Sequence, residues 1–312
     1  MPYLDNVWRS FRISWNHKYL WLIALFAGEG GSGGFNSSTG TGGSPPGRGG
    51  ETTGPPDLGA LPTQVTAWIT EHAGLIVFLI VLWLVLVIAF FILAAICEGA
   101  TVRSSAEHDA DRPWGLSVAW RAGVQTMWAV VRFRLLLILL GLPLLILVVA
   151  FVVGVVIAIV NQNGSAVLPL ILSGFMLVLI SIPYGIYLHF LDRLGSRALV
   201  LEQLRARASI VRAHRLLFKR LGRSLLVWLL SLAVGIVVGI VAGVAFAIVL
   251  IPLFIAGAFA YANNSAALIP IIALGVVIYL PISLVVGGFL SAQSSTYWTL
   301  AFRRLDLDYP PA

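Results

Sequence analysis

The chain has 312 residues, of which 59% are hydrophobic and 11% are charged, and its mean hydropathy is +0.95. A water-soluble globule of this composition would have too little polar surface to face water, so an ordinary soluble protein is excluded. The net charge of +7 raises the possibility of nucleic acid, but the cations lie at the ends of apolar segments, where anionic headgroups attract them. We therefore expect membrane lipids as partners and no nucleic acid.

Six apolar runs divide the chain, and crossing a hydrocarbon core of ~30 Å takes about 20 helical residues. The pattern predicts an all-α integral membrane protein with six transmembrane helices. Because the first run is short and follows a basic segment, we expect its helix to begin earlier, near Arg12, rather than to be a cleaved signal peptide. The runs are Tyr19–Ala27, Ala67–Cys97, Leu135–Val160, Val167–His189, Leu225–Tyr261 and Ala267–Phe289.

This topology puts nineteen of the twenty Lys and Arg residues on one side of the membrane, with only Arg48 on the other. The positive-inside rule then predicts that both termini are cytoplasmic. The expected organisation has five parts. They are an inner stretch and first helix (1–27), a disordered external loop rich in Gly, Pro and Ser (28–64), the second helix and an inner segment (65–112), a second hairpin (113–200), and a third hairpin with a basic amphipathic helix and an inner tail (201–312).

Internal similarity suggests that the six helices form three tandem helical hairpins with amphipathic helices at the inner face. Phe190-Leu191 and Phe289-Leu290 end two returning helices and are 99 residues apart, and an aromatic residue precedes each outward helix. Since every unit begins inside, the repeats would be parallel and related by an axis along the membrane normal. The alternative is that any two hydrophobic hairpins look alike.

The segment Leu204–Leu225 has an amphipathic pattern, and Trp114–Arg134 is a weaker version of it. We expect the first to lie on the inner membrane surface, where each basic residue contributes about 1 kcal/mol toward anionic lipid. Its apolar face comprises Leu204, Ala208, Val211, Phe218, Leu221 and Leu225. The candidate lipid-binding or partner-binding residues are Arg205, Arg212, Arg215, Lys219, Arg220, Arg223, Arg132 and Arg134. The alternative role for these cations is topology and anchoring alone.

Three glycines, Gly235, Gly239 and Gly243, recur every fourth residue in the fifth span and predict a close helix-packing seam. We expect the seam within the chain, and a seam between two chains is the alternative. The segments 73–97, 135–188 and 224–302 contain no Asp, Glu, Lys, Arg or His, which argues against proton- or ion-coupled transport.

No catalytic constellation, metal site or cofactor site is apparent, so we expect a non-enzymatic protein. The acidic cluster Glu107–Asp111 fits a solvated inner loop better than a metal site. A membrane enzyme would need His189, Asp192 and Glu98 around one inner pocket. A transporter for an uncharged or lipidic solute would need a cavity at membrane depth, lined by Ser181, Tyr184, Ser231 and Tyr279.

The segments 15–22, 212–226 and 294–305 resemble uncharacterised bacterial multipass proteins related to the membrane domain beside some glycerophosphodiester phosphodiesterases. The resemblance covers nearly the whole chain. It implies a six-helix membrane domain in the bacterial plasma membrane, and it implies no catalysis, because no soluble catalytic domain accompanies it. The sequence thus predicts an accessory membrane protein that interacts with lipid or a protein partner. The alternatives are a permease-like transporter and a structural subunit of a larger membrane complex.

Overall fold

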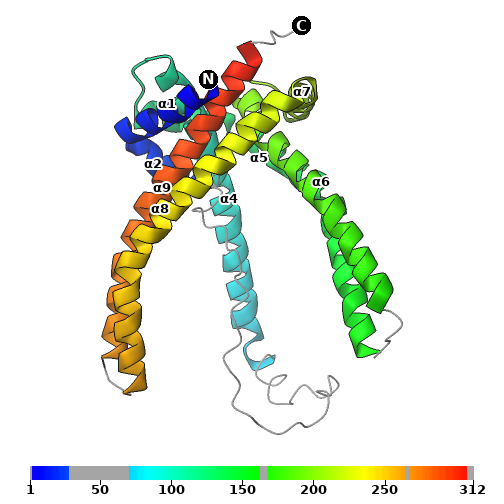
Figure 1. Ribbon diagram of the computed structural model, residues 1–312, viewed down its shortest axis with the longest axis vertical. Coiled ribbons are helices and arrows are strands. Elements are labelled where there is room, and N and C mark those ends of the chain that lie inside the picture. Colours follow the sequence, from blue (N-terminus) through cyan, green and yellow to red (C-terminus); the bar gives the residue numbers. More distant parts are fainter. Residues whose placement is uncertain (1, 28–69, 162–166, 264–266, 308–312) are drawn as a thin grey trace.

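Long apolar helices leave a common bundle in three directions (Figure 1). The structure is a computed structural model that describes residues 2–27, 70–161, 167–263 and 267–307. Over these ranges the chain is helical and has no strand. The helices are α1 (Pro2–Asn16), α2 (Tyr19–Ala27), α4 (Ala73–Asp109), α5 (Leu116–Val160), α6 (Val167–Leu201), α7 (Ala206–Lys219), α8 (Leu221–Ala262) and α9 (Leu268–Leu307).

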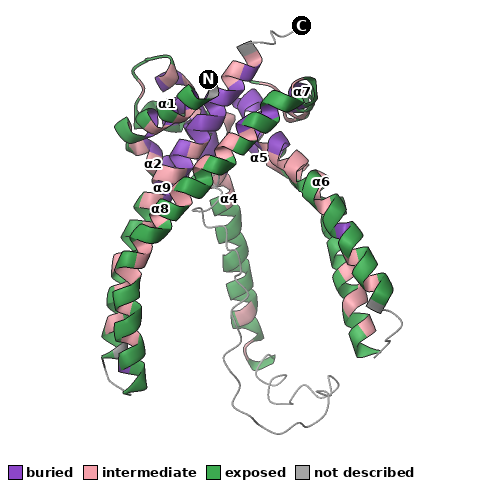
Figure 2. Ribbon diagram, viewed as in Figure 1, coloured by how far each residue is buried: buried purple, intermediate pink, exposed green. Residues whose placement is uncertain are grey.

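The molecule has two kinds of region, which we call the head and the legs. The head comprises residues 2–27, 95–134, 190–227 and 291–307 and contains most of the buried side chains (Figure 2). The first leg is the outer part of α4 (73–94). The second leg is the pair α5 and α6 beyond the head (135–161 and 167–189), and the third is the pair α8 and α9 (228–263 and 267–290).

Five helices are long and apolar enough to cross a membrane, namely α4, α5, α6, α8 and α9. The chain is therefore a multipass membrane protein. The first apolar run does not add a sixth span among the described residues, because α2 has only nine residues. At ~1.5 Å per residue it is about 14 Å long, less than half of a ~30 Å core. The expected start near Arg12 is also wrong, since α1 ends at Asn16 and α2 begins at Tyr19.

The legs expose apolar side chains on nearly every side. In α4, every residue from Val77 to Phe90 is exposed, and the most hydrophobic windows of α5 and α8 contain no buried residue. In water such surfaces would aggregate, whereas hydrocarbon solvates them without cost. The legs therefore meet lipid. The predicted disordered loop at 28–64 lies outside the described residues, and three complete hairpins are not established because the outer part of α4 is not paired with another described helix.

The returning ends of α4, α6 and α9 meet in the head and bring small polar residues together. The hydroxyls of Ser105 and Thr296 are 3.0 Å apart, and Arg197, which is completely buried, donates to the Ser295 carbonyl at 3.5 Å. The returning ends of α4 and α6 also pack on the helices that follow them, α5 and α7, and α9 packs on the first helices of the chain, α1 and α2. The head is thus a packed core in which small polar residues lie among buried apolar ones.

The two inner stretches behave differently. The stretch Trp114–Arg134 is not a separate helix, because α5 continues without a break from Leu116 to Val160 over 45 residues. Its length of about 68 Å at ~1.5 Å per residue exceeds a bilayer core twofold. By contrast, α7 ends at Lys219, and the backbone of Arg220 leaves the helical region at φ −137° and ψ 41° before α8 begins. The predicted inner helix before the fifth span is therefore present.

Close glycine packing occurs in the head and at its border with the third leg rather than in the predicted seam. A Cβ on Gly123 of α5 would lie 2.3 Å from the Ile96 carbonyl oxygen of α4, and a Cβ on Gly288 would lie 2.7 Å from the Trp21 carbonyl oxygen. At Gly235, Gly239 and Gly243 an added Cβ would meet no heavy atom within 4 Å. The expected intrachain seam is therefore wrong, because α9 packs on α8 without covering the glycine face.

Candidate functional site

The predicted cationic residues fall into two groups. Six lie at or near the surface of the head: Arg205, Arg215, Lys219 and Arg223 are exposed around α7 and the start of α8, Arg220 is half-buried between them, and Arg132 is exposed on α5. The other two, Arg212 and Arg134, are internal. On the face predicted to be apolar, Ala208, Val211 and Phe218 are exposed, so no described helix covers them, and their contact with lipid stays a prediction. The buried side of α7 consists of Ser209, Ala213, Leu216 and Leu217.

Arg212 is an internal ion-pair partner. Its side chain is 14% exposed, its Nε lies 3.5 Å from Glu202, and it also pairs closely with Asp306 at the end of α9. Burial raises the pKa of Glu202 above its ordinary value, and the neighbouring Arg212 opposes that shift. The structure thus gives Arg212 a role inside the head, and its predicted contact with lipid stays a prediction.

Arg134 joins three elements of the head. Its guanidinium lies 2.6 Å from the carboxylate of Glu98, whose side chain is 2% exposed, and donates to the Ala27 carbonyl at 2.8 Å. The last carbonyls of a helix have no intrahelical donor and carry partial negative charge, so an arginine at the end of α2 is favourable. The charge of Arg134 therefore links α2 and α4 to α5, and its predicted contact with lipid or a partner stays a prediction.

The acidic cluster at 107–111 is not a solvated loop. Glu107 and His108 are buried near the end of α4. Asp109 bridges two other helices, with Arg9 of α1 at 2.8 Å and Arg303 of α9 at 2.5 Å. This network ties the first and last described helices of the chain to α4.

Two histidines meet beside this network. The rings of His17 and His108 stack with centroids 3.6 Å apart and planes 10° from parallel, and the Tyr19 hydroxyl lies 2.6 Å from Nε2 of His108. Burial lowers the pKa of His17 below its ordinary value. A proton on His17 would place a cation against the face of a second imidazole, so the stack favours neutral rings.

Exposed tryptophans surround the head where the legs begin. Trp8 and Trp15 lie on the exposed side of α1, and Trp120 and Trp128 on the inner part of α5, with 42–76% of each residue exposed. Indole rings concentrate at membrane–water interfaces, because they combine an apolar body with a hydrogen-bond donor. Their position beside exposed arginines is typical of the interfacial layer of a bilayer.

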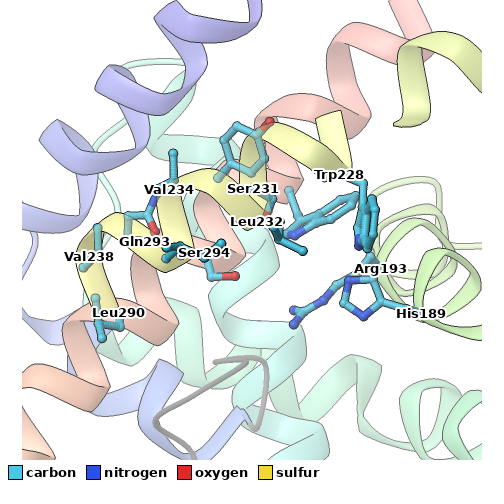
Figure 3. A pocket seen from close by; sticks show the side chains of 14 residues that line it. His189, Arg193, Trp228, Ser231, Leu232, Val234, Val238, Leu290, Gln293 and Ser294 are labelled. Atoms are coloured by element: carbon cyan, nitrogen blue, oxygen red, sulfur yellow. The ribbon is translucent and has the colours of Figure 1, made fainter. Parts of the chain in front are cut away.

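A pocket of about 350 Å³ lies between α6, α8 and α9, at the junction of head and third leg (Figure 3). His189 and Arg193 stand side by side at one end, and Val238 and Leu290 line the other end. His189 packs edge-on against Trp298 with ring centroids 5.8 Å apart. The pocket is therefore polar and cationic toward the head and apolar toward the leg.

The model of one protein family, a family of unknown function named DUF7544, matches residues 11–301. The chain belongs to this family. The DUF7544 match carries no link to the membrane domain of glycerophosphodiester phosphodiesterases, so that resemblance stays a prediction. No curated protein and no solved structure matches the chain.

The four residues that a transporter cavity would need do not all line this pocket of the DUF7544 protein. Ser231 lines the pocket, but Ser181 bonds the Val178 carbonyl at 3.1 Å, Tyr184 bonds the Leu140 carbonyl at 2.6 Å, and Tyr279 packs on Phe246. The residues required for a membrane enzyme do not converge either, since His189 lines this pocket without Asp192 or Glu98. Across the described ranges no three His, Cys, Asp or Glu residues gather in a metal-binding group.

Sequence reasoning missed Arg193 and Trp228 as pocket residues of this DUF7544 protein. One signal was available: His189 and Arg193 are one helical turn apart where an apolar span ends, which puts both on one face of α6. The pair of tryptophans in the pocket wall had a weaker signal. Trp228 and Trp298 are 70 positions apart, and the predicted third hairpin brings their helices together without indicating that these two side chains share a pocket.

Proposed function

We propose that this protein is a non-catalytic accessory protein of the bacterial plasma membrane whose head binds anionic lipid at the cytoplasmic leaflet. One observation carries the proposal: exposed arginines and tryptophans surround the head where apolar legs begin. Anionic headgroups attract such cations, and the tryptophans set the depth of the head at the interface. On this proposal both termini face the cytoplasm.

The surface around α7 is the strongest candidate for lipid contact. It combines exposed cations at Arg205, Arg215 and Arg223 with exposed apolar side chains at Val211 and Phe218. A helix of this kind inserts its apolar side among acyl chains and keeps its cations at headgroup level. Arg212 and Arg134 have no part in this surface, because they hold the head together.

The packing order supports the internal repeat as part of the same proposal. Each returning helix contacts the first inner element of the next unit, and the last of them, α9, contacts α1 and α2. Three units arranged around one axis would give this closed order. The head would then be a ring of repeats that sets the positions of the legs in the bilayer.

The test is lipid retention. The full chain is reconstituted in nanodiscs of mixed phosphatidylglycerol and phosphatidylcholine, and co-purifying lipids are counted by native mass spectrometry. We expect enrichment of phosphatidylglycerol, and we expect Arg205→Gln, Arg215→Gln and Arg223→Gln together to reduce it. The matched control neutralises three other exposed cations of the head, Arg12, Lys18 and Arg121. No enrichment would contradict the proposal, and equal loss in both triple variants would contradict the assignment of lipid contact to the surface around α7.

A further inference from the structure

The pocket between α6, α8 and α9 has the polarity of a site for an amphiphile. Its cationic end faces the head, and its apolar end continues onto the third leg, where Leu232 and Ile236 are 43% and 54% exposed. A ligand can therefore reach it from the bilayer without crossing the head. With a volume of about 350 Å³, the pocket suits a headgroup and leaves acyl chains outside, along the leg.

The charges at the closed end favour an anion. Arg193 is 6% exposed and lines the pocket one turn after His189. His189 interacts electrostatically with two cations, Arg193 and the buried Arg197, and with one anion, Asp192. The local balance is positive. Guanidinium groups bind phosphate oxygens with paired hydrogen bonds, and basic pockets between membrane helices bind phospholipid headgroups.

Neutral hydrogen-bond donors line another part of the pocket. Ser231 of α8 and Ser294 of α9 line the middle of the pocket, between the cations and the apolar end (Figure 3). Hydroxyl groups at this level can donate to phosphate or glycerol oxygens. The indoles of Trp228 and Trp298 close the side of the pocket next to His189.

We infer that this pocket holds the phosphate headgroup of one anionic phospholipid, with its acyl chains lying along the third leg. The inference rests on the proposed function for the class of ligand, but it assigns a separate site with a fixed stoichiometry of one. Lipids at the α7 surface would exchange and be screened by salt, whereas a lipid in the pocket would contact three helices.

Gly235 provides a direct test, because it lines the pocket and a Cβ there would meet no heavy atom within 4 Å. Gly235→Leu is therefore expected to place its side chain in the pocket, because the Cβ has room. Gly239→Leu is the matched control, since its added Cβ also meets no heavy atom within 4 Å but it does not line this pocket. Arg193→Gln removes the charge, and Arg193→Lys keeps it.

The experiment titrates dioctanoyl phosphatidylglycerol into the full chain in neutral detergent and follows the singly bound species by native mass spectrometry. We expect Gly235→Leu and Arg193→Gln to weaken this binding about tenfold or more, since one charge-assisted contact is worth about a factor of ten. Gly239→Leu leaves it unchanged, and Arg193→Lys retains part of it. Equal affinities for Gly235→Leu and Gly239→Leu would overturn the inference.

Two further arms distinguish the alternatives. Glycerol 3-phosphate binding as tightly as the lipid would overturn the inference in favour of a soluble anion, and equal binding of dioctanoyl phosphatidylcholine would overturn the preference for anionic lipid. The triple variant at Arg205, Arg215 and Arg223 separates the two proposals. If the triple variant loses lipid while Gly235→Leu and Arg193→Gln do not, this inference alone is overturned. If the unmodified protein retains no anionic lipid, both proposals are overturned.

Discussion

The head and the legs belong to one chain but are stabilised in opposite ways. In the head, buried polar groups such as Glu98 and Arg197 lie among close helix contacts, and ion pairs join helices that are distant in sequence. In the legs, leucine, isoleucine, valine and phenylalanine are exposed along whole helices. The head therefore depends on specific partners inside the protein, while the legs depend on the lipid around them.

This difference shows that the role of an arginine in a membrane protein depends on whether its side chain is exposed or paired inside the protein. Exposed arginines of the head are available to lipid, but Arg134 and Arg212 have the same side chain and a structural role. It also predicts that substitutions in the head change folding and that substitutions in the legs leave it nearly unchanged.

The largest effect is expected at the buried pair of the head. Arg134→Gln should lower the free energy of unfolding by about 3–5 kcal/mol, because Glu98 would lose the cation 2.6 Å away and stay buried. Unfolding in detergent, followed by circular dichroism, measures the loss. Adding Glu98→Gln should restore part of it, and the exposed neighbour Arg132→Gln should change stability by less than about 0.5 kcal/mol. Equal effects of Arg134→Gln and Arg132→Gln would refute the structural role.

The second effect compares glycines of the two regions. Gly123→Ala should cost about 1–3 kcal/mol, because its methyl group would lie 2.3 Å from the Ile96 carbonyl oxygen and would push α5 away from α4. Gly239→Ala in the third leg meets open space and should be neutral or slightly stabilising, since alanine favours the helix. The same unfolding assay measures both. A larger loss for Gly239→Ala would show that the leg glycines pack and the head glycines do not.

The third effect concerns the network at Asp109. Asp109→Asn should cost about 1 kcal/mol, because its partners Arg9 and Arg303 are 48% and 40% exposed and water screens both pairs. The difference from the unmodified protein should shrink in high salt. Asp5→Asn, at an exposed position of α1, is the control and should have no measurable effect. A loss that does not respond to salt would argue against ion pairing.

The smallest effect is a dependence of head stability on pH. Burial lowers the pKa of His17 below its ordinary value of 6.5, so between pH 6.5 and the folded pKa the unfolded chain binds a proton that the folded chain does not. Stability should therefore fall as pH falls through this window. Melting temperatures at pH 7.5 and 5.5 test it, and His17→Gln should reduce the decline. A decline of the same size in His17→Gln would exclude this histidine as a cause.

Sequence patterns predicted the properties that depend on local order. Apolar runs gave the long helices, and the break before the fifth span is present at Arg220. These patterns did not predict contacts between residues that are distant in the sequence. The partner of Arg212 at Asp306 lies 94 positions away, and helical periodicity assigns faces without saying which neighbour covers them. The same limit explains the error at Gly235, because small residues permit a close contact but do not identify a partner.

The central claim is that the legs stand separately in lipid while the head is packed. It is tested most directly by oxygen accessibility of single nitroxide labels placed in turn at residues 77–90 of α4, in a Cys97→Ser background in nanodiscs. Because every one of these residues is exposed, we predict uniformly high accessibility with no helical period. Labels at Ala95 and Ala100, which are buried in the head, should be protected. A 3.6-residue oscillation along 77–90 would show that another helix covers one face of this leg and would contradict the account.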